Sequence, residues 1–101
     1  MNISRLTTRI LIVDDDDSHR VMLQTVLSKD GYEIIEADDG QGAISRVESE
    51  SFDLIMLDLR MKHVQGIQAL QKIKQMRPSI PVLIMTAYAS VETAVNGLKL
   101  G

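Results

Sequence analysis

An apolar run that ends in a carboxylate, FDLIMLD at residues 52–58, constrains the fold of this chain more than any other stretch. Its central residues, Leu54 to Leu57, are apolar without alternation, which is typical of a strand covered on both faces in a parallel sheet. Asp58 then stands at the carboxyl end of the expected strand. Ligands of open α/β sheets bind outside the carboxyl ends of the strands, where the strand order reverses. Asp58 is therefore a candidate site residue, although an aspartate here would also suit a simple turn.

The rest of the chain alternates between short apolar segments and segments with helical spacing. After a loosely ordered lead-in over residues 1–8, further strands are expected at residues 9–13, 33–37 and 82–85. Helices are expected from Ser18 to about Lys29, from the turn at residues 38–40 to about Ser49, around Ile67, Leu70 and Ile73, and over residues 91–98. The first helix carries apolar side chains over an unusually broad arc, so it is expected to be covered from two sides.

This alternation predicts an α/β fold in which a doubly wound parallel sheet has right-handed crossovers. The strand at residues 33–37 carries Glu33 and Glu36 beside its apolar centre, which favours a place at the sheet edge. The strand order is then expected to be 2-1-3-4, with the reversal between the first and third strands. Asp14, Asp15 and Asp58 would line the crevice at that point.

Composition narrows the classes of partner. The 101 residues suffice for one domain, and a net charge of −3 without a basic run argues against nucleic-acid or membrane surfaces. The chain has no cysteine, which excludes disulfides and thiolate chemistry and fits a reducing compartment. The apolar run at residues 10–13 is too short for a signal-peptide core, so a soluble cytoplasmic protein is expected.

Three carboxylates brought close together repel one another unless a cation or a proton offsets their charge. Mg²⁺ is commonly held by one or two carboxylates plus water and phosphate oxygens, so this cluster points to phosphoryl chemistry with magnesium. Thr86 ends the neighbouring strand and places a hydroxyl where it could bond to a phosphoryl oxygen. The acidic run at residues 14–17 equally suits a helix N-terminus, and the isolated His19 and His63 do not suggest a metal site.

Four motifs together resemble the receiver domain of bacterial two-component response regulators: ILIVDDDD, FDLIMLDLRM, the downstream Gly66 and PVLIMTAYAS. The resemblance implies a flavodoxin-like fold over a single domain at residues 1–101. It implies that Asp58 is the phosphoacceptor, that Asp14 and Asp15 bind Mg²⁺, and that the backbone carbonyl of Arg60 is a further ligand. Thr86 would be the switch hydroxyl that moves toward the phosphoryl group.

The same resemblance implies a sensor histidine kinase as the phosphoryl donor, and a signalling module rather than an enzyme. The stretch TAYASVETAVNGLKLG looks most like receivers of the enhancer-binding class, which carry an ATPase and a DNA-binding output domain further on. A homodimer is one expected assembly, while direct contact of this domain with nucleic acid or a membrane is not expected.

Two departures from the family pattern matter. The loop at residues 61–66 lacks the usual proline and acid. The chain also ends before the family's fifth strand and fifth helix, so the lysine that pairs with the phosphoryl group and the aromatic switch residue are expected to be missing. The strand at residues 82–85 would then be a bare sheet edge, which predicts poor stability or self-association. Arg60 and Tyr88 would flank the path of the hydrolytic water and are expected to prolong the life of the aspartyl phosphate.

Two other functions stay open. ILIVDDDDS also fits the first motif of haloacid dehalogenase-like phosphatases, with Asp14 as nucleophile and Asp16 as general acid. Such enzymes need a lysine and further acidic residues later in a longer chain. The third hypothesis is an interaction module that works without phosphorylation, and the expected absence of the lysine favours it. The aspartate that a small phosphodonor labels, Asp58 or Asp14, separates the first two functions, and magnesium affinity separates the third.

Overall fold

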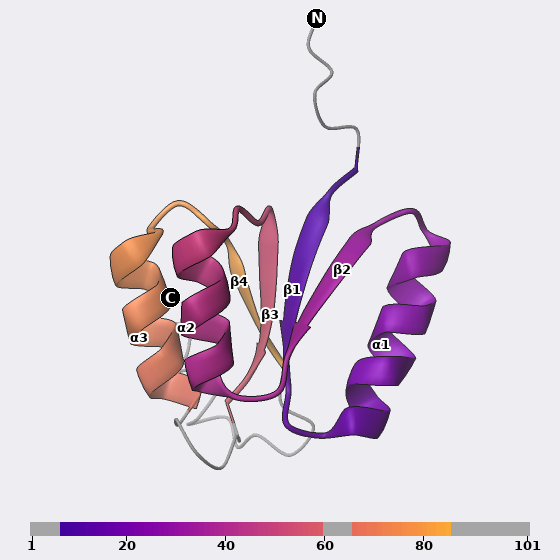
Figure 1. Cartoon of the computed structure of the whole chain (residues 1–101), viewed down its shortest axis with the longest axis horizontal. Coiled ribbons are helices and arrows are strands. Elements are labelled where there is room, and N and C mark those ends of the chain that lie inside the picture. Colours follow the sequence, from indigo (N-terminus) through magenta and orange to yellow (C-terminus); the bar gives the residue numbers. More distant parts are fainter. Residues whose placement is uncertain (1–6, 60–65, 86–101) are drawn as a thin grey trace, which may run out of the picture.

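A computed structural model of the chain describes residues 7–59 and 66–85. In this part of the chain four parallel strands form one sheet in the order β2-β1-β3-β4 (Figure 1). The strands are β1 (Arg9–Val13), β2 (Glu33–Ala37), β3 (Leu54–Asp58) and β4 (Val82–Met85). The predicted 2-1-3-4 order is confirmed, and the strand order reverses between β1 and β3.

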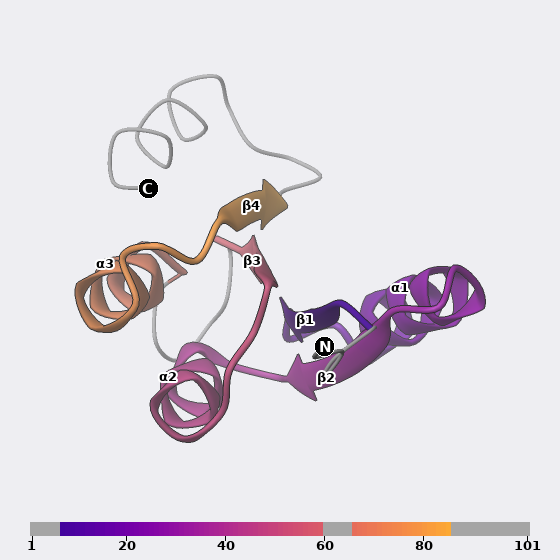
Figure 2. The same ribbon diagram turned by 90° about the horizontal axis from the view of Figure 1, so that it is seen from above.

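Helices lie on both faces of the sheet, as the doubly wound prediction requires. They are α1 (Asp17–Lys29), α2 (Gly40–Ser49) and α3 (Gly66–Met76). Seen from above, α2 and α3 lie side by side on one face, and α1 lies on the other (Figure 2). The first helix begins one residue before the predicted Ser18, because the Asp16 carboxylate accepts a hydrogen bond of 3.1 Å from the His19 amide and caps the helix there.

The core lies between the sheet and the α2–α3 pair. β1 is its centre, since Leu11 and Val13 are fully buried and pair in register with Ile55 and Leu57 of β3. From the helices, the buried side chains are Ala43, Val47, Ala69, Leu70 and Ile73. Two of the three unbroken apolar runs, β1 and β3, are therefore inner strands as predicted, whereas the third, β4, lies at an edge of the sheet that the described residues form.

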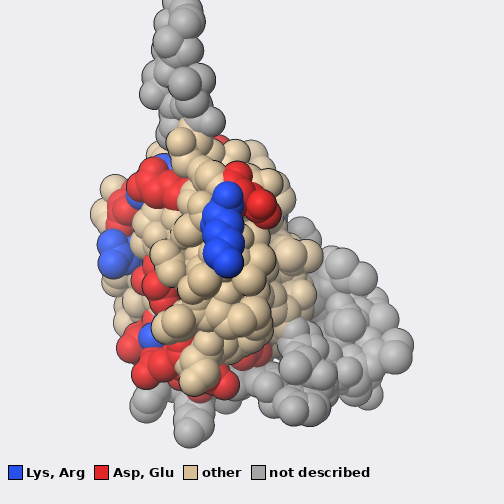
Figure 3. Space-filling view, turned by 90° about the vertical axis from the view of Figure 1, so that its right-hand side faces the viewer, with Lys and Arg blue, Asp and Glu red and all other residues tan. Residues whose placement is uncertain are grey.

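The other face is packed differently. No residue of α1 is buried, and the exposed fractions are 60% for Val21, 49% for Met22 and 52% for Val26. The described residues do not supply the second cover that the broad apolar arc predicts, because they place only the sheet beside this helix. In Figure 3, which faces α1, acidic side chains gather at the lower end, where the helix begins, and further acidic and basic side chains lie toward the upper end, with uncharged surface between them.

Gly66 begins α3 directly against the end of β3. A Cβ atom at this residue would lie 2.2 Å from the Leu59 Cα and 2.7 Å from the Asp58 carbonyl oxygen, distances that no side chain tolerates. Glycine is required here because one backbone approaches another, and its φ angle is not in the left-handed region. The close approach fixes the first turn of α3 beside the strand end that carries Asp58.

Several expectations lie outside the described residues. They concern most of the lead-in, the loop with Arg60, the hydroxyl of Thr86, the side chain of Tyr88 and the helix at residues 91–98. At the other end of the sheet, β4 pairs with β3 among the described residues, and 51% of Leu83 is exposed. No helix in residues 7–59 and 66–85 is long and apolar enough to cross a membrane.

Candidate functional site

Three carboxylates meet at the carboxyl edge of the sheet. Because Val13 of β1 pairs with Leu57 of β3, the residues that follow them in register, Asp14 and Asp58, are neighbours. Asp15 comes next on the loop into α1. One oxygen from each of Asp14, Asp15 and Asp58 lies within 4.8 Å of the others. The three carboxylates that were predicted to meet at the reversal of strand order therefore lie together there.

This cluster is enclosed to a degree unusual for aspartate. The exposed fraction is 1% for Asp14 and 7% for Asp58, whereas Asp15 is half-buried. Burial and mutual repulsion both disfavour several negative charges in one place. Oxygen ligands at this spacing suit a small divalent cation, which would offset the charge without needing nitrogen or sulfur donors. The donor set thus fits the magnesium that the sequence predicts.

Asp14 is held at each of its polar groups. Its amide donates to the Ala37 carbonyl of β2 at 3.1 Å, and its carbonyl accepts from Nη1 of Arg20 at 2.7 Å. Its carboxylate accepts at Oδ1 from the Asp16 amide at 2.9 Å and contacts Nδ1 of His19 at Oδ2. These contacts fix both the position of the residue and the rotation of its carboxylate.

The acidic run at residues 14–17 divides into two pairs with different tasks. Asp14 and Asp15 point into the cluster, while Asp16 and Asp17 belong to the start of α1. Asp16 caps the helix, and Asp17 pairs with Nη2 of Arg20 one turn later. The helix-terminus interpretation therefore holds for the second pair, whereas Asp14 and Asp15 precede the capping residue and lie beside Asp58. Asp16 is exposed and engaged as a cap, which does not support its role as the general acid of a phosphatase.

Two further residues at this edge, His19 and Arg20, carry no clear signal in the sequence. His19 looked isolated because its partner Asp14 precedes it by five residues, across the loop that turns β1 into α1. The signal that could have found both was the helix start: a helix capped by Asp16 directs its first turn back toward the strand ends. Arg60 and Thr86, the other two predicted site residues, lie outside the described residues.

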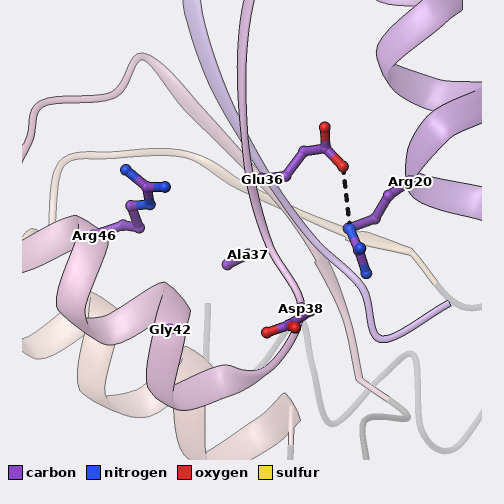
Figure 4. A pocket seen from close by; sticks show the side chains of 6 residues that line it. All are labelled: Arg20, Glu36, Ala37, Asp38, Gly42 and Arg46. Atoms are coloured by element: carbon purple, nitrogen blue, oxygen red, sulfur yellow. Dashed lines mark hydrogen bonds and ion pairs between the residues drawn. The ribbon is translucent and has the colours of Figure 1, made fainter. Parts of the chain in front are cut away.

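A cavity of about 330 Å³ lies between the end of β2, the start of α2 and the first turn of α1. It is lined by Arg20, Glu36, Ala37, Asp38, Gly42 and Arg46 (Figure 4). Within it Nε of Arg20 donates to Oε1 of Glu36 at 3.1 Å. Burial alone would lower the pKa of Arg20, but hydrogen bonds to Asp17 and Glu36 and the charges of both raise it. The guanidinium therefore stays charged beneath the loop that carries the cluster.

Comparison with known proteins gives one consistent result. Residues 10–101 match the family described as "Response regulator receiver domain". The transcriptional regulatory protein ZraR of Escherichia coli (strain K12) is 51% identical over 92 residues, which are 91% of this chain and 21% of that relative. This chain thus spans about one fifth of the length of ZraR.

Solved structures agree with the sequence relatives. A CheY-like receiver domain protein from Methanospirillum hungatei JF-1 is 33% identical with a TM-score of 0.89, and the match covers 94% of this chain and 76% of that one. A response regulator from Burkholderia pseudomallei is 28% identical with a TM-score of 0.87, covering 93% of this chain and 55% of that one. Its crystal structure has a phosphorylated aspartic acid, a calcium ion and citrate.

Proposed function

This chain belongs to the response regulator receiver domain family, and on that basis we propose that it takes up a phosphoryl group on Asp58 from a phosphohistidine of a sensor histidine kinase. The observation that carries the proposal is the meeting of Asp14, Asp15 and Asp58 at the reversal of strand order, with their oxygens within 4.8 Å. The phosphorylated aspartate of the Burkholderia relative supports the same chemistry for this chain. Residues 1–101 would form a single receiver domain.

Asp58 is the nucleophile in this proposal. One of its carboxylate oxygens forms a bond to phosphorus while the phosphorus–nitrogen bond of the donor breaks, and the electron pair leaves with the imidazole. The end of β3 and the first turn of α3 hold Asp58 in place through the close approach of Gly66 to the backbone. This fixed geometry favours in-line attack, since positioning is much of what phosphoryl transfer asks of a protein.

A magnesium ion would be held by Asp14, Asp15, Asp58 and the backbone carbonyl of Arg60, the last from outside the described residues. When bound, the ion offsets the negative charge of the carboxylates and the phosphoryl oxygens. The enclosed, all-oxygen donor set supports this assignment, as does the calcium ion in the Burkholderia relative. The Thr86 hydroxyl would donate to a phosphoryl oxygen and so act as the switch.

The domain would act as a signalling module within a longer transcriptional regulator of the cytoplasm. Its relative ZraR is named a transcriptional regulatory protein and is about five times as long as the stretch that matches, which leaves room for output domains. By the resemblance to the enhancer-binding class, these would be an ATPase and a DNA-binding domain. A homodimer of receivers is a further part of the proposal, without direct contact of this domain with DNA or a membrane.

The decisive experiment is to label the protein with acetyl phosphate and Mg²⁺ and to map the adduct by peptide mass spectrometry. We expect the adduct on the peptide that contains Asp58, and its loss in Asp58→Asn. Asp38→Asn is a matched control because Asp38 is an exposed aspartate at the same edge, and it should label normally. An adduct on Asp14 instead would indicate phosphatase-type chemistry, and absence of both labelling and Mg²⁺ binding would indicate an interaction module.

Magnesium binding offers an independent test. Titration calorimetry should show weaker Mg²⁺ binding in Asp15→Asn and Asp58→Asn than in the parent protein, because each variant removes a charged ligand. Equal affinity in the parent and both variants would show that the ion, if it binds, binds elsewhere.

A further inference from the structure

One guanidinium ties together three segments at the site edge. Arg20, on the first turn of α1, donates from Nη1 to the Asp14 carbonyl at 2.7 Å and from Nε to Glu36 of β2 at 3.1 Å. Its Nη2 also donates to Asp17. The side chain is only 14% exposed. An enclosed charge needs partners for its donors, and here each of the three guanidinium nitrogens makes one contact.

Arg20 and its three contacts, here called the clamp, hold the loop that carries two of the three carboxylates. Asp14 and Asp15 lie on the loop between β1 and α1, and their carboxylates face that of Asp58 across the strand ends. Repulsion between the three groups would move the loop away from β3 unless something holds it. The Ala37 carbonyl holds the loop from the β2 side, and Arg20 holds it from the helix side.

We propose that Arg20 is a positioning residue for the divalent-ion site: it fixes the loop that carries Asp14 and Asp15 at binding distance from Asp58 before the ion arrives. This inference rests on the proposed function, because it requires that the ion binds at these carboxylates. Preorganisation increases affinity since the ligands need not be brought together at the moment of binding. Glu36 and Asp17 serve as anchors that keep the guanidinium under the loop.

The direction in which removal of Arg20 changes the Mg²⁺ affinity separates a positioning role from a purely electrostatic one. If Arg20 acted only through its positive charge, removing that charge would make the site more negative and Mg²⁺ would bind more tightly. If Arg20 contributed only to the fold, its removal would lower stability and leave the Mg²⁺ affinity of the folded protein unchanged. Of these three roles, only positioning predicts that removal of Arg20 weakens Mg²⁺ binding.

The test compares Arg20→Met with Arg46→Met. Both guanidinium groups line the same cavity, but Arg46 belongs to α2 and pairs with Glu50 at 2.8 Å, away from the cluster. Mg²⁺ dissociation constants are measured by calorimetry, and urea unfolding without the ion gives the folded fraction for correction. We expect roughly tenfold weaker binding in Arg20→Met, the lower end of the usual effect of residues that orient metal ligands. Arg46→Met should stay within about twofold of the parent.

Two further variants keep the test informative if Arg20→Met folds poorly. Glu36→Gln removes the charge of one anchor at the sheet edge and should weaken Mg²⁺ binding about two- to threefold, less than loss of the clamp itself. Arg20→Lys keeps the charge but loses the forked geometry, so it should not restore the parental affinity. Unchanged or tighter binding in Arg20→Met, an equal loss in Arg46→Met, or full affinity in Arg20→Lys would each overturn the inference.

Failure of the inference can be told apart from failure of the proposed function. Binding that disappears in Asp58→Asn but persists undiminished in Arg20→Met would overturn the role of Arg20 alone. Binding that is unaffected by Asp15→Asn and Asp58→Asn would overturn the ion site, and the role of Arg20 with it.

Discussion

The two faces of the sheet are held by different kinds of interaction. On one face, α2 and α3 bury Ala43, Val47, Leu70 and Ile73 against the inner strands. On the other, Ile10 and Ile12 of β1 are buried, but no residue of α1 itself is, and the helix is tied to the strand ends by polar contacts. The packed face therefore supplies most of the hydrophobic stabilisation, whereas the α1 face supplies the contacts that orient Asp14. Substitutions on the two faces should accordingly change different measured quantities.

The largest effect on stability is expected from Ile73→Ala on the packed face. This fully buried side chain leaves a cavity beneath α3, which should lower the free energy of unfolding by about 2–5 kcal/mol. Urea unfolding measures the loss, and calorimetry on the folded protein should give an unchanged Mg²⁺ dissociation constant. A large change in ion affinity would mean that the two faces are not separable.

Gly66→Ala should change both the stability and the phosphorylation of Asp58, because the packed face meets the site at this residue. The added methyl would overlap the backbone of Leu59 and Asp58, so α3 must move, at a cost of about 1–3 kcal/mol. Labelling of Asp58 by acetyl phosphate should slow as the strand end shifts. In Gly42→Ala the nearest atom outside the helix backbone is Oδ1 of Asp39 at 3.2 Å, so this control should change stability by less than about 1 kcal/mol.

Removal of a helix cap gives a smaller effect on the packed face. The Asp39 carboxylate accepts from the Gly42 amide at 2.7 Å at the start of α2, and Asp39→Ala should cost about 1 kcal/mol. Its effect should appear in urea unfolding and leave the Mg²⁺ affinity unchanged. A variant as stable as the parent would show that packing alone fixes this helix start.

The smallest effect is expected on the exposed side of α1. Val26→Thr should change the free energy of unfolding by no more than about 0.5 kcal/mol, because this side chain is 52% exposed. Val47→Thr makes the same substitution at a fully buried residue of α2 and should cost about 1–3 kcal/mol, since its hydroxyl enters an apolar core. Equal costs at the two valines would indicate that α1 is covered in solution.

The elements that sequence analysis predicted best are those with the strongest local patterns. Unbroken apolar runs predicted the inner strands β1 and β3, although β4 has the same pattern and lies at an edge of the described sheet. The flanking Glu33 and Glu36 correctly predicted β2 as an edge. The meeting of Asp14, Asp15 and Asp58 followed from strand order, because parallel strands end at one edge. The site residues Arg60 and Thr86 stay predictions, since they lie outside the described residues.

The features that could not be predicted from the sequence are contacts between residues on either side of a loop. The contacts of His19 and Arg20 with Asp14 require that α1 begins at Asp17 and that its first turn faces β1. The helix start was predicted one residue later, at Ser18. The close approach at Gly66 is likewise a tertiary feature, because its neighbours, Asp58 and Leu59, lie at the end of β3 and directly after it. Hydrophobic periodicity carries no information on polar contacts of this kind.

The pairing of β1 with β3 also has a kinetic consequence. The Arg9 amide bonds to the Asp53 carboxylate at 2.8 Å across 44 residues of sequence, and the rest of that pairing spans similar separations. Such non-local pairing must close a long loop before its contacts stabilise the chain, which slows folding in parallel sheets. A nascent chain cannot bring Asp14 beside Asp58 until this closure is complete. Assembly of the acidic cluster therefore requires the pairing of β1 with β3, and a chain in which these strands are not yet paired lacks the cluster.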